Sequence, residues 1–382
     1  MKISIIGNGF AALAAIDHLR CLDRSRHIDL TVISPQASFL YHPSLIWIPS
    51  GQRSGTDIQC NLERYFRRHG VTHHAGEAVS IQNQGRTVVT TSGSVTNDGL
   101  LIAAGATYLK KAPGIEHTVN PCSGVEAATA IHQQLQAMDS GVIAMGFSSN
   151  PAEPEAIRGG PLFEFLFGMD TYLRKIGRRD RFKLIFFAPM SEPGKRLGPK
   201  AVKGLLSTMQ HRDIETHLGK KIVGFAPRQI LLEGQTEAIH ADMILFLPGM
   251  TGSPWLAQTG MELSSGGFLK ADSHCRVAGG TKVYVAGDAG SFPGPDWRAK
   301  QAHMAELQAK TAVRNLCAEL LNQPANHTFR TELICIIDTL DHGIWVSRFD
   351  HFNLNLILPP LKPMHRLKQW LESRAMRRYG VG

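Results

Sequence analysis

The chain has 382 residues, 43% of them hydrophobic, so it is long enough for two or three domains and a large buried core. It has no stretch of the roughly 18 apolar residues that a membrane-spanning helix needs. The formal net charge of +9 favours a polyanionic partner; because positive charge gathers near the C-terminus and no clustered basic and aromatic motif occurs, we expect an anionic membrane surface and no nucleic acid.

The chain begins with a pattern that is typical of a dinucleotide-binding βαβ unit. An apolar run is followed by G-x-G-x-x-A at residues 7–12, and then by an apolar stretch of helical period up to Leu19. In such a turn Gly7 bends the chain, Gly9 lets the backbone approach a pyrophosphate, and Ala12 permits close packing of the helix on the strand. Glycine-rich turns also occur in α/β proteins that bind no nucleotide, so for this turn alone both interpretations stay open.

The second strand of this unit is expected over residues 28–33, and it ends at Ser34, which is followed by Pro35. An acid usually stands there and holds the ribose hydroxyls of the nucleotide, whereas a serine would bind ribose more weakly. Since the first strand starts at the beginning of the chain, we expect no signal peptide or transit segment before it.

Further apolar runs predict buried strands along the chain, and the last of these strands is followed by a helix. The strands are expected at residues 98–105, 141–146, 182–187, 242–247 and 283–286, and the helix at about 299–320. The last strand leads into Gly287 and Asp288. Taken alone, this aspartate is also explained as a helix N-cap.

Taken in order, the first turn, Gly76–Val79, Ala104–Gly105 and Ala286–Asp288 resemble motifs of the two-domain flavoproteins of the pyridine nucleotide–disulfide oxidoreductase superfamily. The resemblance implies an α/β fold with two Rossmann-like dinucleotide-binding domains. It implies an FAD-binding domain of residues 1–112 and 265–320, a second, degraded Rossmann-like domain of residues 113–264, and a C-terminal segment, 321–382, with an amphipathic helix at a membrane interface.

FAD is the cofactor that the resemblance implies. Val79 would lie beside the adenine, Asp288 would bind the ribityl and phosphate region, and the helix that begins near Ala302 would point its N-terminus at flavin N1 and O2. No metal site is expected, because the six cysteines include no CxxC spacing. The implied cofactor-binding residues are Gly7, Gly9, Phe10, Ala11, Ala12, Ser34, Pro43, Val79, Ala104, Gly105, Gly287, Asp288, Lys300, Gln301 and Ala302.

Within the superfamily the chain is most similar to the sulfide:quinone oxidoreductase branch, which includes the flavoprotein subunit of flavocytochrome c sulfide dehydrogenase. The local matches are a segment that a cysteine opens at 122–128, Gly-Pro-Leu-Phe-Glu at 160–164, and the ending formed by residues 333–338 and 370–380. The resemblance implies that a quinone accepts the electrons from FAD.

The second nucleotide fingerprint of the chain is degraded. Gly146 is followed by Pro151 and Pro154, where a glycine-rich turn would otherwise admit a pyrophosphate. We therefore expect neither NADH nor NADPH as the electron donor. This agrees with the sulfide branch, in which the substrate reduces the flavin directly.

The chain departs from this branch at its redox cysteines. The branch carries a cysteine pair beside the flavin; Cys335 matches one member, but Arg158 stands at the other position, six residues before Glu164. Cys122 matches a third cysteine of some members, near the dimethylbenzene edge of the flavin. Three interpretations stay open: Cys335 acts alone, through a persulfide or a flavin adduct; Cys335 pairs with Cys122; or sulfur chemistry is lost and Arg158 serves another substrate.

If the correspondence holds, Arg158 lies beside Cys335, and its charge favours the thiolate. The counterpart of Glu164 lies near the quinone pocket, which implies a role in proton relay. Each residue also has a structural explanation: Cys335 as a buried thiol, Arg158 as a solvated loop charge, and Glu164 as a first-turn acid that complements the helix dipole.

The helix expected after Pro363 carries Leu367, Trp370 and Leu371 on one face. Such a helix fits the interface of an anionic membrane, and docking on its own domain or on a second copy in a homo-oligomer is the alternative. We expect a cytoplasmic protein that associates peripherally with the inner face of the membrane. The basic residues of the helix are Arg366, Lys368, Arg374, Arg377 and Arg378.

The expected function is therefore that of a FAD-dependent oxidoreductase of the sulfide:quinone oxidoreductase type, which passes two electrons from sulfide or a small thiol to a membrane quinone. A type II NADH dehydrogenase-like quinone reductase and a flavin-binding protein without turnover are the alternatives.

Overall fold

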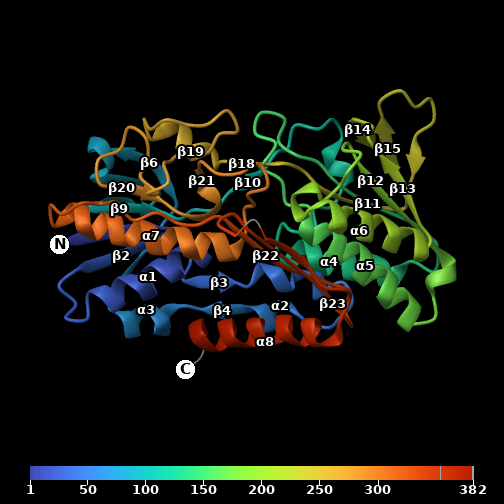
Figure 1. The fold of residues 1–382 in the computed structure, drawn as a ribbon, viewed down its shortest axis with the longest axis horizontal. Coiled ribbons are helices and arrows are strands. Elements are labelled where there is room, and N and C mark those ends of the chain that lie inside the picture. Colours follow the sequence, from blue (N-terminus) through green and yellow to red (C-terminus); the bar gives the residue numbers. More distant parts are fainter. Residues whose placement is uncertain (353, 381–382) are drawn as a thin grey trace.

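The computed structural model describes residues 1–352 and 354–380, so residues 353, 381 and 382 of the expected C-terminal segment lie outside the described residues. Two parallel β-sheets lie towards opposite ends of an elongated molecule, and the C-terminal strands lie between them (Figure 1). The architecture is α/β, as expected from the alternation of strands and helices.

The first sheet has the strand order β20-β9-β1-β2-β5 and is parallel throughout. Strands from both ends of the chain therefore build one sheet, which brings the turns after β1 and β20 to the same edge. The strands are β1 (Lys2–Ile6), β2 (Asp29–Ser34), β5 (Val71–Ala75), β9 (Gly99–Ile102) and β20 (Val283–Val285). One face is covered by helices α1 (Phe10–Leu22), α3 (Glu63–His69) and α7 (Ala302–Leu320), and the other by the antiparallel strands β6 (Ala78–Gln82), β7 (Thr87–Thr90) and β8 (Gly93–Thr96).

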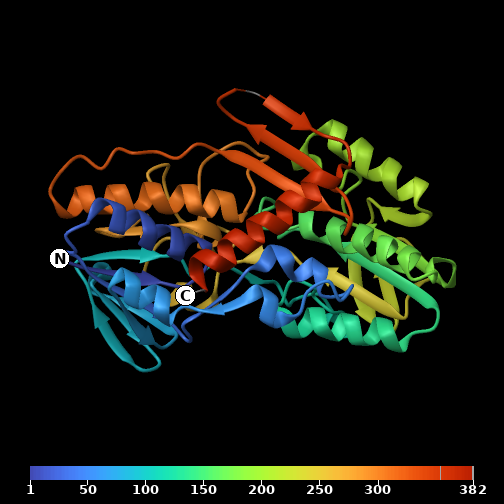
Figure 2. The same cartoon turned by 90° about the horizontal axis from the view of Figure 1, so that it is seen from below.

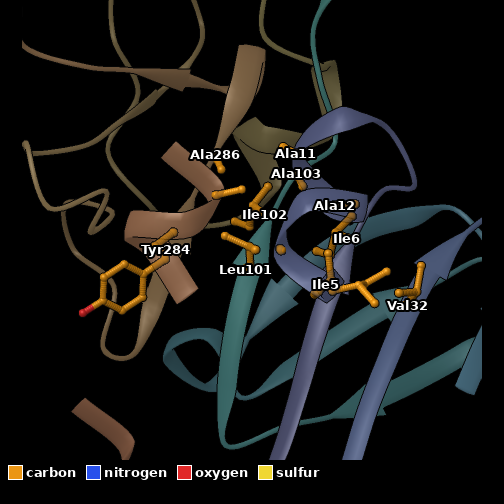
Figure 3. Packing of buried hydrophobic residues seen from close by; sticks show 14 of the residues in the cluster. Ile5, Ile6, Ala11, Ala12, Val32, Leu101, Ile102, Ala103, Tyr284 and Ala286 are labelled. Atoms are coloured by element: carbon orange, nitrogen blue, oxygen red, sulfur yellow. The ribbon is translucent and has the colours of Figure 1, made fainter. Parts of the chain in front are cut away.

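The apolar run at the start of the chain forms β1 because its side chains are buried in the centre of this sheet. Ile5 lies in register with Val32 of β2 and Leu101 of β9. Ala11 and Ala12 of helix α1 pack over these strands, as Figure 3 shows, and both are buried. Their small side chains let the helix approach the sheet closely, as the first-turn motif predicts.

The second sheet is also parallel, in the order β13-β12-β11-β17. Its strands are β11 (Gly141–Phe147), β12 (Phe182–Ala188), β13 (Ile214–Leu218) and β17 (Met243–Leu247). Helices α4 (Val125–Ala137), α5 (Gly160–Lys175) and α6 (Pro199–His211) pack around it, together with the antiparallel strands β14 (Ile222–Ala226), β15 (Gln229–Leu232) and β16 (Ile239–His240).

Several short elements lie outside the two main sheets. They are the strand pairs β3 (Ser38–Leu40) with β4 (Gln59–Asn61), β10 (Thr107–Tyr108) with β18 (Met250–Thr251), and β19 (Leu269–Lys270) with β21 (Gly290–Ser291), and helix α2 (Gly55–Ile58). Single 3-10 turns lie at His42–Trp47, Asn83–Gly85, Ile115–His117, Arg179–Arg181, Lys195–Leu197, Pro254–Gln258 and Gly287–Ala289.

The C-terminal residues form the antiparallel strands β22 (Glu332–Asp338), β23 (Gly343–Phe349) and β24 (Leu354–Ile357), followed by helix α8 (Lys362–Tyr379). Leu333 and Ile337 of β22 are buried in the same core as the second sheet. Helix α8 crosses over both halves (Figure 2), and Tyr379 near its end packs against Phe39 and Tyr65. The helix is thus docked on its own chain.

One of the basic residues of helix α8 does not lie on its surface: Lys368 is buried. The reason is that its ammonium group pairs with the carboxylate of Glu164 on α5, which lies far away in the sequence. Arg366, Arg374, Arg377 and Arg378 are exposed.

Candidate functional site

The turn after β1 has the geometry that a dinucleotide needs. Gly7 adopts φ = +108°, and its N–H donates to the carbonyl of Ile33 at 2.9 Å. A Cβ at Gly7 would collide with the carbonyl of Ala103, whereas a Cβ at Gly9 would meet nothing within 4 Å. Because Gly9 stands at the N-terminus of α1, the backbone there can approach an anionic group, so these residues fit the pyrophosphate of FAD.

The turn after β9 contributes a second open position. Gly105 has φ = +69°, and a Cβ placed on it would meet nothing within 4 Å. Phe10, at the start of α1, is half-buried and its ring meets the edge of Phe39, with centroids 5.1 Å apart. Ala104 and Pro43 are half-buried beside this region. Gly9 and Gly105 therefore leave open space at the edge of the first sheet where FAD is expected.

At the end of β2, Ser34 stands where an acid would otherwise hold the ribose of the nucleotide. Ser34 is buried, and its hydroxyl donates to the carbonyl of Gln36 at 3.0 Å and lies 3.0 Å from Nε2 of His73. Because the hydroxyl hydrogen of Ser34 is already donated to Gln36, this hydroxyl could only accept a hydrogen bond from a ribose. Val79 is exposed and free to meet an adenine. These contacts to FAD stay predictions.

The turn after β20 carries Asp288, and its carboxylate forms an ion pair with the guanidinium of Arg158. A second Arg158 nitrogen lies 3.5 Å from the hydroxyl of Tyr108. Burial is the largest single influence and acts to lower the pKa of the Arg158 guanidinium, but Asp288, Tyr108 and Cys122 together raise it. Arg158 is thus not the solvated loop charge of the structural alternative.

The residues at the start of α7 are held mainly by backbone groups. Nζ of Lys300 donates to the carbonyls of Asp288 at 2.9 Å and Gly290 at 2.7 Å, and burial lowers its pKa to about 8. The side chain of Gln301 donates to the carbonyl of Glu332 at 2.8 Å. With these side chains engaged, it is the backbone N–H groups from Ala302 onward that are available to a flavin. Gly287, Asp288, Lys300 and Gln301 line one cleft.

Cys122 lies in the turn before α4 and is buried. Burial raises the pKa of its thiol to about 12, even though Arg158 and a hydrogen bond with Tyr108 act in the opposite direction. Tyr108 was not predicted as a site residue, although it lies only three residues after Gly105. The structure thus brings Cys122, Tyr108, Arg158 and Asp288 into one cluster.

Cys335 lies on β22 and belongs to a different set of contacts. Burial, followed by the charge of Glu164, raises the pKa of the Cys335 thiol to about 12, and Lys368 only partly offsets this. The expectation of a thiolate favoured by Arg158 is therefore wrong, because burial and a carboxylate dominate at this thiol. Both Cys335 and Cys122 are free thiols, so the expected alternative of a bond between them is not realised in the structure.

Glu164 links this thiol to the C-terminal helix. Its carboxylate accepts hydrogen bonds from Nζ of Lys368 and from the backbone N–H of Asp338, the latter at 2.8 Å. Burial raises the pKa of Glu164 to about 7, although Lys368 acts against this shift. The alternative of a first-turn acid is wrong, because α5 begins at Gly160 and its first turn holds no acid.

Asp338 on β22 and His365 on α8 form a second polar contact between the core and this helix. Asp338 accepts hydrogen bonds from the indole of Trp47 at 3.0 Å and from the ring of His365 at 2.6 Å. Burial acts to raise the pKa of Asp338, but the hydrogen bond with His365 contributes to a net lowering. Near the middle of α8, Glu372 pairs with Arg53 at 2.8 Å. The polar face of α8 is therefore the face that docks, which the sequence pattern did not predict.

The loop from residue 148 to 159 stands where the second sheet would receive a nucleotide. The N–H of Ser148 donates to the carbonyl of Leu247 at 3.0 Å, and buried Asn150 donates to the carbonyl of Met250 at 2.9 Å. A Cβ on Gly249 would collide with Ser149 and Asn150. The loop thus packs over the ends of β11 and β17, where the pyrophosphate of a Rossmann unit binds.

Within residues 1–352 and 354–380, no helix is long and apolar enough to cross a membrane.

Comparisons with known proteins agree with this geometry. The family model described as pyridine nucleotide-disulphide oxidoreductase matches residues 1–309. A sulfide-quinone reductase of Aquifex aeolicus is 24% identical over 88% of this chain and 80% of its own length. A type II NADH:quinone oxidoreductase of Mycobacterium tuberculosis is 24% identical over 82% of this chain and 72% of its own length.

Among solved structures, the sulfide:quinone oxidoreductase of Aquifex aeolicus superposes with a TM-score of 0.87 at 20% sequence identity, and the match covers 99% of this chain and 91% of that chain. The similarity to the sulfide:quinone oxidoreductase branch, expected from local motifs, is thus confirmed in sequence and in fold. Because the family model covers most of its length, the chain belongs to the pyridine nucleotide-disulphide oxidoreductase family and is a FAD-dependent oxidoreductase.

Proposed function

We propose that this protein passes two electrons from sulfide or a small thiol through FAD to a membrane quinone. The observation that carries the proposal is the loop of residues 148–159, which packs against Leu247 and Met250 where a nicotinamide dinucleotide would otherwise bind. A flavoprotein whose second nucleotide site is filled by its own chain needs a donor that reaches the flavin directly.

The donor side of the proposed site contains thiols but no cysteine pair. Cys335 lies beside Glu164, and Cys122 lies beside Tyr108 and Arg158. We propose that Cys335 acts alone and that Glu164 exchanges a proton near it, since a carboxyl with a pKa of about 7 is suited to proton transfer at neutral pH. FAD, when bound, accepts the electron pair from the donor and releases it to the acceptor.

The acceptor side is proposed to face an anionic membrane through α8 and strand β24. Two apolar residues of α8 point outward, since Trp370 is 49% exposed and Leu371 is 39% exposed, whereas Leu367 is half-buried. Phe352 and Leu354 are also exposed, and Arg366, Arg374, Arg377 and Arg378 are exposed on the same helix. Apolar side chains beside several arginines fit the interface of anionic lipid, and we propose peripheral attachment to the cytoplasmic face of the membrane.

An anaerobic titration of the FAD-loaded protein tests this function. Sulfide or a small thiol is expected to bleach the flavin absorbance, and a soluble quinone is expected to restore it. Bleaching by NADH in place of sulfide would favour the NADH dehydrogenase-like alternative. Bound FAD that neither sulfide, thiols nor NADH reduce would favour a flavin-binding protein without turnover.

A further inference from the structure

Asp288 is held from two directions by cations that come from different parts of the chain. Its carboxylate pairs with Arg158, which lies on the loop that leads into α5. Its backbone carbonyl accepts a hydrogen bond at 2.9 Å from Lys300, just before α7, and the Lys300 ammonium also lies 3.8 Å from the centre of the Phe268 ring. The residue expected to contact the ribityl and phosphate part of FAD is therefore fixed by both halves of the molecule.

The loop that carries Arg158 is itself fastened to the FAD-binding half. Glu153 accepts a hydrogen bond from Ser291 at 2.8 Å, and it also pairs with the hydroxyl of Ser264. Ser291 lies on β21, directly after the turn that holds Asp288. Arg158 lies on this loop and Asp288 lies on the turn to which the loop is hydrogen-bonded. The guanidinium therefore approaches the carboxylate from a fixed direction.

An unpaired carboxylate in this position would oppose cofactor binding. The pyrophosphate of FAD is anionic, and like charges a few ångströms apart repel strongly where water is partly excluded. An arginine offsets the carboxylate charge and orients its oxygens by hydrogen bonding at the same time. Hydrogen bonds that involve charged groups are also stronger than neutral ones.

We propose that Arg158 is a cofactor-positioning residue, which orients Asp288 for the ribityl chain of FAD and supplies the charge that makes this carboxylate compatible with the pyrophosphate. Arg158 thereby takes a role different from that of the redox cysteine that its sequence position suggests. The proposal rests on FAD binding alone and does not depend on which donor or acceptor the enzyme uses.

The test compares FAD binding by apoproteins that carry Arg158→Met, Arg158→Lys, Asp288→Asn and the double substitution Arg158→Met with Asp288→Asn. Binding is followed by the quenching of FAD fluorescence, without donor or quinone. We expect Arg158→Met to weaken FAD binding at least tenfold, Arg158→Lys to restore most of it, and the double variant to bind better than Arg158→Met, because its uncompensated carboxylate is gone.

The midpoint potential of the bound flavin is a second measurement. If Arg158 had a purely structural role, the substitutions would not shift this potential in opposite directions. Loss of a positive charge disfavours the reduced, more anionic flavin, so Arg158→Met is expected to lower the potential and Asp288→Asn to raise it. The matched control is Arg228→Met, which breaks the exposed Arg228–Asp242 pair in the second sheet region and is expected to change neither reading.

Wild-type FAD affinity and potential in Arg158→Met would overturn the proposal, and so would an Arg158→Lys protein that binds FAD no better than Arg158→Met. If Arg158→Met does not fold, as judged by circular dichroism of the apoprotein, Arg158→Lys and Asp288→Asn decide the question. Opposite shifts of the potential support the proposal, and shifts of the same sign contradict it.

Discussion

The carboxylate of Glu164 on α5 and the ammonium of Lys368 on α8 form a buried ion pair across 204 residues of sequence. The pair lies next to the thiol of Cys335, whose pKa responds to both charges. It therefore joins the surroundings of this buried thiol to the helix whose outer face carries Trp370 and Leu371. Protonation of Glu164 would therefore change the charge beside the Cys335 thiol and weaken the ion pair with Lys368 on α8.

Glu164 should impose a pH dependence near neutrality. Its pKa in the folded protein is raised to about 7 from 4.5, so the carboxyl is protonated below that pH and ionised above it. We expect flavin reduction by sulfide to change with an inflection near pH 7, and Glu164→Gln to abolish this inflection, as measured by stopped-flow absorbance. Lys368→Met should move the inflection to higher pH, because Lys368 lowers the pKa of this carboxyl. An inflection that persists in Glu164→Gln would assign it to another group.

The same shift predicts how stability depends on pH. A carboxyl whose pKa is raised on folding binds its proton more tightly in the folded protein, so its stabilising contribution is full below pH 4.5 and is lost as the pH rises through about 7. Urea unfolding across this range should therefore show a smaller fall in the free energy of unfolding for Glu164→Gln than for the wild type. Equal slopes in both proteins would contradict the raised pKa.

The thiols at positions 335 and 122 should differ from the exposed thiol of Cys21 in reactivity. The pKa of each buried thiol is about 12, so at neutral pH both are protonated and should react slowly with iodoacetamide. If Cys335 carries the sulfur chemistry, Cys335→Ser should slow flavin reduction by sulfide on the order of 100-fold. Cys21→Ser is the control and should have no effect. Unchanged reduction in Cys335→Ser would exclude a role for this thiol in the oxidation of sulfide by FAD.

The local parts of the site could be predicted from the sequence because short-range sterics determine them. Gly7 needs a positive φ and Ala12 needs a small side chain, and both requirements are readable from the spacing of the first turn. That the turns carrying Ala104–Gly105 and Asp288 lie at the same edge follows from the parallel pairing of β9 with β20, which only the structure shows.

The charged contacts could not be predicted in the same way. Counting six residues back from Glu164 singles out Arg158, but it does not predict that Arg158 pairs with Asp288. A long side chain can reach several neighbours, and the sequence does not show which of them it meets. The pairing of Lys368 with Glu164 depends on how α8 docks, and helical periodicity only shows which residues share a face. The periodicity predicts that the apolar face meets a membrane or docks, whereas in the structure Lys368, Glu372 and His365 of the polar face make the docking contacts.

The loop over the second sheet predicts that NADH is a poor reductant. Asn150 is buried and bonded to Met250, so a dinucleotide would have to displace this contact before it could bind. Mixing the FAD-loaded protein with NADH at micromolar concentration should leave the flavin oxidised over seconds, whereas sulfide should reduce it. Rapid bleaching by NADH would show that the loop opens.

The buried charge of Asp170 should be important for the stability of the second sheet region. It is fully buried and accepts hydrogen bonds from Arg179 at 2.6 Å and Arg212 at 3.0 Å. Asp170→Ala leaves the buried Arg179 without its partner and should lower the free energy of unfolding by about 3–5 kcal/mol. Arg174→Ala removes only a half-exposed partner of the same carboxylate and should cost about 0–1 kcal/mol. Urea denaturation measures both, and a similar loss in the two variants would contradict this assignment.

The outer face of α8 predicts attachment to anionic lipid. Trp370 is 49% exposed and Leu371 is 39% exposed, although both are apolar. Trp370→Gln with Leu371→Gln should reduce sedimentation with phosphatidylserine vesicles. Replacing Arg374 and Arg377 by Gln should weaken binding by about 2 kcal/mol, or about 30-fold, because each arginine near such a surface contributes about 1 kcal/mol.

The control for this attachment is Leu22→Gln with Leu321→Gln, since these leucines are 51% and 54% exposed but lie far from α8 in sequence. This control variant should bind vesicles as the wild type does, and neutral phosphatidylcholine vesicles should bind every variant weakly. Salt should release the wild-type protein, because exposed arginines act through a screened surface potential. A wild-type protein that ignores anionic vesicles and elutes as a dimer, with Trp370→Gln restoring the monomer, would show instead that this face joins two copies of the chain.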